Sequence, residues 1–405
     1  MTRVTDLRLR RIYDSRGLET VEATIVGEDG AVGVAGAPSG ASTGIHEVRA
    51  FPPGGVTEAL ATFARLLRPR LTGADLDDQA TFDGLLHAVD GTANFAHVGG
   101  NTATALSVAF ALAGARSHGE TLARRLARPG VRLTEFPAIV GNCMNGGRHA
   151  IGGPEIQEFI AFSPAANPSD SVATALQVHH RIGEALRAKF PTLALGRGDE
   201  GGWVAPLSSL EALEILSAAC THVTDATGIP VHPGLDLAAS EFYHDGQYRY
   251  RDRTLDDEGQ LEFVTTLVER FGLRYVEDPF QQEDFESFAR LTSSIGSRAL
   301  VVGDDLYTTA LGRVKRGADC KATNAVLIKV NQVGTLTDTL ATVDFARDHA
   351  MESVTSHRSG EVPEGWLAHL ALANGSAGLK CGLLGGERVA KLNELLSLGA
   401  ATGAP

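Results

Sequence analysis

The sequence has few cysteines and no long apolar run, and both absences exclude whole classes of protein. The four cysteines among 405 residues are far apart and form no CxxC pair, so neither a disulfide framework nor a zinc site is expected. No apolar stretch approaches the roughly 20 residues of a membrane-spanning helix. The first residues also lack the apolar segment of a secretory signal. We therefore expect a cytoplasmic protein without a membrane partner.

Positive charge is also scarce, and lysine is the scarcest part of it. The formal net charge is −13, which argues against nucleic acid as a partner. This charge does not exclude a small anionic substrate, because a metal ion and local Arg or Lys can outweigh the global field. Only six of the 36 basic residues are lysines. Two of the six, Lys329 and Lys380, lie at the ends of strand-like runs, where arginine could not act as a base.

Six short apolar runs between residues 231 and 382 each end at a group that ionises or binds charge. The runs span residues 231–235, 273–276, 299–303, 325–328, 353–356 and 378–379. Helix-length segments separate them, and this alternation is typical of a (β/α) barrel. The active site of such a barrel gathers at the carboxyl ends of its parallel strands. The residues that follow the runs are therefore the first candidates for a site.

Acidic residues follow three of these runs, namely Asp236, Glu277 and Asp304. A single Asp after a strand is more often the N-cap of the next helix, but three acidic strand ends converge on one mouth. They would repel one another unless a divalent cation lay among them. Oxygen ligands without His or Cys favour Mg²⁺ over Zn²⁺. Lys329 ends the next run, and a nearby cation together with burial would lower its pKa and make it a base.

The rest of the chain predicts a smaller domain before the barrel. Alternating apolar and polar residues predict strands over 4–12 and 20–27, and helices are predicted over 56–71, 75–89, 101–128, 169–190 and 208–225. The loop at 37–44 is rich in Gly and Ser, so it is either a plain surface turn or a lid whose serine approaches a ligand. We expect an α/β protein with residues 1–130 as a capping domain and residues 131–405 as the barrel.

Taken together, these segments resemble enolase over nearly the full chain. The matching motifs lie at 14–17, 39–44, 90–94, 145–147 with 149–150, 157–159, 198–202, 235–242, 277–280, 304–306, 329–332 and 356–361. Such a series in one order is specific. The resemblance implies an enolase-type (β/α)8 barrel, in which one early strand runs antiparallel to the rest, with an N-terminal α+β capping domain. It also implies a homodimer or a higher homo-oligomer.

The resemblance implies a Mg²⁺-dependent lyase and assigns its central groups. Asp236, Glu277 and Asp304 match the ligands of the first Mg²⁺. Ser42 matches the lid serine that joins a second Mg²⁺ when substrate is bound, so two ions are expected. Lys329 matches the base that removes the proton alpha to a carboxylate.

The remaining matched residues surround the substrate. Glu200 matches the acid that helps the β-hydroxyl leave as water, with Glu158 beside it. Taken alone, His149 after its Gly-Gly turn is more typical of a packed or surface histidine. Further contacts with substrate are implied for Ala41, Gln157, His149, His357, Arg358, Ser359 and Lys380. Hydroxide is a poor leaving group, so Glu200 must be protonated when it acts, and we expect the neighbouring Glu158 to raise its pKa.

Several loops around the expected mouth depart from the family pattern, for example near Ile151, Pro363 and Leu383. Drift of exposed loops is one explanation. The other explanation, which the sequence favours, is a specialised enzyme similar to carboxyphosphonoenolpyruvate synthase of antibiotic pathways. Such an enzyme keeps the proton-abstraction machinery and takes a phosphonate or phosphinate analogue. The alternative is a glycolytic enolase that interconverts 2-phosphoglycerate and phosphoenolpyruvate. A non-catalytic binding relative is disfavoured, because such a role needs no base at Lys329.

Overall fold

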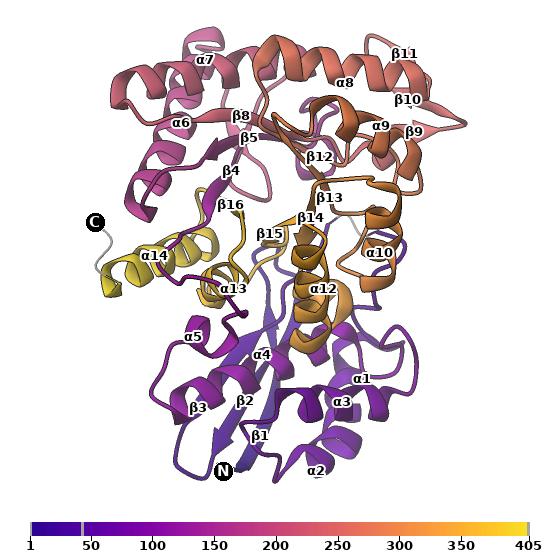
Figure 1. The fold of residues 1–405 in the computed structure, drawn as a ribbon, viewed down its shortest axis with the longest axis vertical. Coiled ribbons are helices and arrows are strands. Elements are labelled where there is room, and N and C mark those ends of the chain that lie inside the picture. Colours follow the sequence, from indigo (N-terminus) through magenta and orange to yellow (C-terminus); the bar gives the residue numbers. More distant parts are fainter. Residues whose placement is uncertain (1, 42–43, 403–405) are drawn as a thin grey trace.

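The N-terminal part of the computed structural model, which describes residues 2–41 and 44–402, is a three-stranded antiparallel sheet covered by helices (Figure 1). The strands are β1 (Val4–Tyr13), β2 (Glu19–Gly27) and β3 (Val32–Gly36), in the order β1-β2-β3. The helices are α1 (Gly55–Thr62), α2 (Arg68–Leu71), α3 (Gln79–Asp90), α4 (Gly100–Ser117) and α5 (Leu122–Leu126). Helix α4 packs on the sheet so closely that a Cβ on Gly33 would lie 1.8 Å from the carbonyl oxygen of Ala109.

One expectation for this part is wrong, and two of its features were not predicted. The single helix predicted over 101–128 is wrong: α4 ends at Ser117, Gly119 adopts a φ of +62°, and α5 restarts where Thr121 caps the backbone of Arg124. The helix predicted over 56–71 contains a π-helical turn at Phe63–Leu67. Strand β3 was not predicted, because its five residues carry no clear alternation of apolar and polar side chains.

The C-terminal part is a closed eight-stranded barrel, as predicted. Its strands are β4 (Ala138–Asn145), β5 (Glu158–Ser163), β8 (His232–Asp236), β12 (Tyr275–Glu277), β13 (Leu300–Gly303), β14 (Ala325–Ile328), β15 (Glu352–Ser356) and β16 (Gly378–Gly382). The pairing of β16 with β4 closes the barrel. Strand β5 runs antiparallel to both neighbours, and the other pairs within the barrel are parallel. Glu158 therefore begins its strand at the rim where Asp236 ends its own, and the two residues are paired in register.

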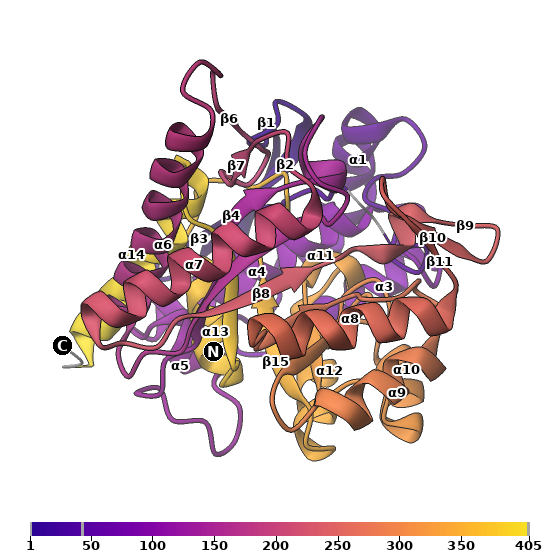
Figure 2. The ribbon, with the colours of Figure 1, turned by 90° about the horizontal axis from the view of Figure 1, so that it is seen from above.

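Helices surround the barrel and short strands decorate its rim (Figure 2). The outer helices are α6 (Pro168–Lys189), α7 (Ser209–Thr227), α8 (Asp257–Phe271), α9 (Phe285–Ile295), α10 (Leu311–Cys320), α12 (Leu336–Asp348), α13 (Trp366–Asn374) and α14 (Gly386–Ala401). The rim carries α11 (Val330–Val333), the strand pair β6 (Gly196–Arg197) and β7 (Trp203–Val204), and the small sheet β9 (Tyr243–His244), β10 (Gln247–Arg249) and β11 (Thr254–Leu255). The barrel interior is filled by buried side chains such as Val140, Ile160, Tyr275 and Val354, so it is a packed core and not a pore.

The N-terminal part packs against the rim of the barrel. Ser39 forms a bridge with Gly360 after β15, and the amide of Asn331 in α11 donates to the carbonyl of Pro38.

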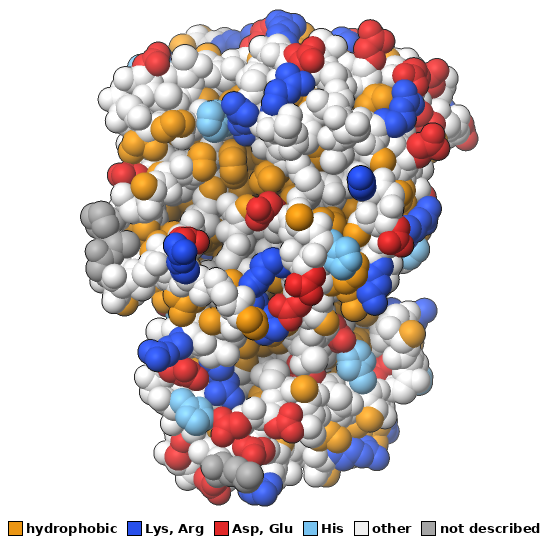
Figure 3. All heavy atoms as spheres, viewed as in Figure 1, with side chains coloured by type: hydrophobic (Ala, Val, Ile, Leu, Met, Phe, Trp, Pro, Cys, Tyr) orange, Lys and Arg blue, Asp and Glu red, His pale blue; other side chains and the backbone are white. Residues whose placement is uncertain are grey.

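Among the described residues, no helix is both long and apolar enough to span a membrane. On the face seen in Figure 3, acidic and basic side chains are interspersed over both parts.

Candidate active site

Three buried carboxylates stand at the ends of neighbouring strands. Asp236 ends β8, Glu277 ends β12 and Asp304 follows β13, and all three are almost completely buried. Asp236 and Glu277 are paired in register on adjacent parallel strands. Burial, followed by repulsion from Asp236, raises the pKa of Glu277 to about 8. Buried carboxylates that repel one another in this way are suited to bind a hard divalent cation such as Mg²⁺.

Lysines from two other strands lie among these carboxylates. The Lys380 ammonium, from β16, donates to Asp236 Oδ2 at 2.9 Å and to Glu277 Oε1 at 2.8 Å. Lys329, directly after β14, donates to Asp304 Oδ2. The expected lowering of the pKa of Lys329 depends on a nearby cation as well as on burial, and it stays a prediction. Burial does lower this pKa, but the charge of Asp304 outweighs burial and holds the pKa of Lys329 above its ordinary value.

Removing Lys380 should make folding depend on metal. We expect Lys380→Met to lower the free energy of unfolding by about 3–5 kcal/mol in EDTA, because buried carboxylates lose their counter-charge. Added Mg²⁺ should restore part of the loss, and urea denaturation with and without the ion measures both quantities. Lys189→Met is the matched control, since its pair with Glu211 is solvent-exposed and is worth about 1 kcal/mol or less. Equal stability of Lys380→Met and the native protein in EDTA would contradict this account.

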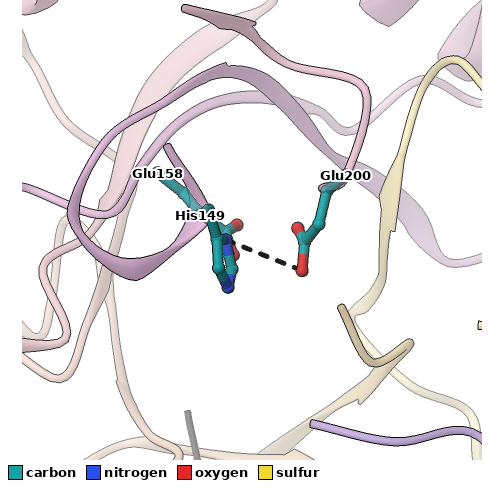
Figure 4. Close-up of side chains that lie close together, drawn as sticks. All are labelled: His149, Glu158 and Glu200. Carbon is teal, nitrogen blue, oxygen red and sulfur yellow. Dashed lines mark ion pairs between the residues drawn. The ribbon is translucent and has the colours of Figure 1, made fainter. Parts of the chain in front are cut away.

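His149, Glu158 and Glu200 form a second group of buried side chains in the site (Figure 4). His149 Nδ1 lies 3.4 Å from Glu158 Oε1 and 3.8 Å from Glu200 Oε1. Residues Gly146 and Gly147 bring His149 inward: a Cβ on Gly146 would lie 2.3 Å from the carbonyl oxygen of Pro154. The histidine is thus buried in the site and not at the surface.

The two carboxyls of this group titrate in the opposite order to the one we expected. Burial and the charge of Glu200 raise the pKa of Glu158 well above its usual range. Burial also raises the pKa of Glu200, but His357 and His149 outweigh it and hold that pKa well below its usual range. His357 Nε2 lies 3.1 Å from Glu200 Oε2, and the Asn142 amide donates to the same oxygen at 2.9 Å. Of the two carboxyls, Glu158 is therefore the one whose environment favours the protonated form.

The remaining predicted side chains complete one cavity. It is lined by Gly40, His149, Gln157, Glu158, Glu200, Asp236, Asp304, Lys329, Ser356, His357, Arg358, Ser359 and Lys380. Two predicted residues lie just outside this lining: Glu277 contacts Lys380, and the backbone N–H of Ala41 donates to Ser359 Oγ at 2.6 Å. Ser42, the predicted ligand of a second metal ion, lies outside the described residues.

Three residues that support the site were missed by the sequence analysis. Arg388 in α14 is fully buried, and it donates to the carbonyls of Arg358 and Ser359 at 2.5 Å each. Asp278 accepts the backbone N–H groups of Asp304 and Asp305, at 3.0 and 2.7 Å, and so fixes the loop that carries Asp304. Glu47 pairs with Arg358 at 3.0 Å. Only Asp278 carried a signal, the Glu-Asp-Pro sequence at a strand end; Arg388 and Glu47 lie in segments without one.

Comparison with known proteins agrees with this geometry over the whole chain. Residues 4–126 match the family described as "Enolase, N-terminal domain", and residues 134–404 match "Enolase, C-terminal TIM barrel domain". The chain is similar to a protein named enolase from Methanosphaera stadtmanae, with 43% identity over 98% of this chain and 96% of that protein. Enolases of Methanothermobacter thermautotrophicus and Methanocorpusculum labreanum are each 45% identical over 98% of this chain and 96% and 99% of their own lengths. The chain belongs to the enolase family and is a hydro-lyase.

Proposed function

We propose that this enzyme interconverts 2-phosphoglycerate and phosphoenolpyruvate. The observation that carries the proposal is a single cavity with Lys329 beside the acidic strand ends and the Glu158–Glu200 pair beside His149 and His357. Loss of water from a 2-phospho-3-hydroxy acid needs a base for the proton alpha to the carboxylate and an acid for the departing hydroxyl. The curated relatives, which are named enolase at 40–45% identity over nearly their full lengths, support the same reaction.

In this proposal Lys329 removes the alpha proton, and Glu200 helps to protonate the leaving hydroxyl. Mg²⁺ held by Asp236, Glu277 and Asp304 would neutralise the negative charge that develops on the substrate carboxylate. Lys380, already 2.9 Å from Asp236, contributes fixed positive charge at the same place. Because the cation would add positive charge next to Lys329, it also favours the neutral amine that can accept a proton.

The acid function in this proposal belongs to Glu158 and Glu200 together. Glu158 is the carboxyl that more readily holds a proton, because burial and the charge of Glu200 raise its pKa. Glu200 faces His357 and Asn142, whose contacts favour its charged form. His149, which lies within 3.8 Å of both carboxyls, is placed to carry the proton between them. Arg358, Ser359 and Gln157 line the cavity and are proposed to hold the phosphate and carboxylate groups of the substrate.

The loops that depart from the family pattern give no support to a phosphonate substrate. The side chain of Ile151 is fully exposed, and neither Pro363 nor Leu383 lines the cavity. Leu383 instead packs against Gly141 in the barrel wall. Our preference for a specialised enzyme is therefore replaced by the alternative, and the divergent loops fit drift outside the site.

The decisive assay is the absorbance of enolpyruvate formed from 2-phosphoglycerate. We expect robust turnover with Mg²⁺, loss of turnover in EDTA and full recovery when Mg²⁺ is added back. The reason is that the three carboxylates supply only oxygen ligands, which Mg²⁺ prefers. Turnover that survives EDTA would contradict the metal assignment. Weak turnover with Mg²⁺, together with metal-dependent binding of a phosphonate analogue in calorimetry, would instead support the function of a specialised enzyme.

Three further features belong to the proposal. We place the division between capping domain and barrel near residue 130, in the segment between α5 and β4. Membership of the family supports a homodimer or higher homo-oligomer. A second Mg²⁺, joined by Ser42, is proposed from the family motif alone.

A further inference from the structure

The segment that follows residue 43 is held against several barrel loops at once. Gly44 packs so tightly that a Cβ there would lie 2.5 Å from Thr308 Cγ2. The backbone N–H of Ile45 donates to Gln282 Oε1 at 3.1 Å, and His46 Nε2 lies 2.6 Å from Glu283 Oε1. These contacts fix the backbone from which the next side chain, Glu47, projects toward the site.

The side chain of Glu47 is largely buried and joins three different parts of the molecule. Its two carboxylate oxygens accept from Arg358 Nη1 and Nη2 at 3.0 Å each, a bidentate pair. Oε1 also accepts from the Gln332 amide at 3.3 Å and from the backbone N–H of Gly44 at 3.2 Å. The side chain of Glu47 is only 8% exposed. A buried carboxylate with this many donors is a fixed feature of the site and not a surface ion pair.

The same network reaches the proposed metal site. The Gln332 amide that donates to Glu47 donates also to Asp304 Oδ1 at 2.9 Å. After Glu47, the next acidic groups that act on the charge of Arg358 are Asp304 and Asp305. If Glu47 lost its charge, the buried guanidinium of Arg358 would therefore be drawn toward Asp304, because a buried cation needs a counter-charge. Arg358 would then leave the cavity wall and compete with a metal ion.

We propose that Glu47 is a positioning residue that holds Arg358 toward the substrate phosphate and away from the metal carboxylate Asp304. The proposal rests on the function proposed above. Glu47 acts through Arg358 and Gln332 and needs no contact with substrate. It thereby makes substrate binding and metal binding depend on one carboxylate that the N-terminal part contributes.

The test compares Glu47→Gln with the native enzyme in titrations of 2-phosphoglycerate and of Mg²⁺. We expect the KM for 2-phosphoglycerate to rise about 10-fold and the Mg²⁺ concentration for half-maximal rate to rise several-fold. The value of kcat should fall less than KM rises, because the reacting groups remain in place. Glu47→Asp, which keeps the charge on a shorter side chain, should recover part of both losses. A lower KM in Glu47→Gln would overturn the proposal, because it would make Glu47 a competitor of the phosphate.

Asp83→Asn is the matched control. Asp83 is also a buried carboxylate that joins the N-terminal part to the barrel, where it accepts from the backbone and hydroxyl of Thr337 at 3.0 and 2.6 Å, but it lies outside the cavity lining. This variant should leave KM and the Mg²⁺ requirement unchanged even if it unfolds at lower temperature. Equal losses in both variants would reduce Glu47 to a structural contact. If the native enzyme does not turn over 2-phosphoglycerate, the proposed function fails separately, and calorimetry of Mg²⁺ and 2-phosphoglycerate binding then compares the same variants.

Discussion

Replacing Lys329 by alanine is expected to lower kcat by about 10³-fold or more, because a general base contributes roughly 10²–10⁴-fold and no other amine of the site can take its place. Lys380 is held by Asp236 and Glu277 and remains charged. The variant should also stop the exchange of the alpha proton of 2-phosphoglycerate with D₂O, which NMR follows directly. Loss of exchange would identify the missing step as proton removal.

Two controls separate this effect from damage to the fold. Lys329→Arg keeps the positive charge beside Asp304 but cannot release its proton at neutral pH, so it should be as inactive as the alanine variant. Lys315→Ala, in the outer helix α10, should be indistinguishable from the native enzyme. Circular dichroism and the melting temperature should show that all three variants are folded. Exchange at the native rate in folded Lys329→Ala would disprove the assignment of the base.

Replacing Glu200 by glutamine should uncouple the two halves of the reaction. We expect the formation of phosphoenolpyruvate to fall by about 10²–10⁴-fold, because the amide cannot relay a proton to the leaving hydroxyl. Exchange of the alpha proton should continue, since Lys329 and the acidic strand ends are untouched. The isosteric amide keeps a contact with His357, which lies 3.1 Å away in the native enzyme.

The ratio of the two rates is the informative quantity. Native enzyme should show exchange and elimination at comparable rates, whereas Glu200→Gln should show exchange with little elimination. Asn142→Asp, which changes a donor to Glu200 into a second acid, should raise the pKa of Glu200 and shift the pH profile of elimination upward while exchange is less affected. Loss of both rates in Glu200→Gln would instead assign Glu200 to substrate binding.

The barrel was predictable because its signal is carried by short, separated apolar runs. Each of the six runs from residue 231 onward forms part of a barrel strand, and the residues that end them meet at one rim. The helix boundaries around Gly119 were not predictable in the same way, because an apolar periodicity that continues across a turn hides the break. Strand β3 is stabilised by α4 lying on it, a long-range contact that no local pattern encodes.

Some residues of the candidate site could be predicted from local sequence patterns, and others could not. Residues at strand ends, such as Asp236 and Asp304, could be found because strand direction alone brings them together. The pKa shifts of Lys329, Glu158 and Glu200 could not be predicted, since they depend on the contact of Lys329 with Asp304 and on distances of 3–4 Å to His357 and His149. Glu47 and Arg388 belong to elements far away in sequence, and only the packed structure relates them to Arg358.

The pairing of β16 with β4 has a consequence for how the chain emerges and folds during synthesis. Gly378 pairs with Ala138, so the barrel stays open until its last strand has left the ribosome. Until then β4 and β15 are unpaired edges that can join other chains. Strand β16 also carries Lys380, the counter-charge of Asp236 and Glu277. The pairing of β16 therefore both closes the hydrogen-bonded ring and neutralises the buried acids. A nascent chain that stalls before this step is prone to aggregate, and its acidic strand ends repel one another.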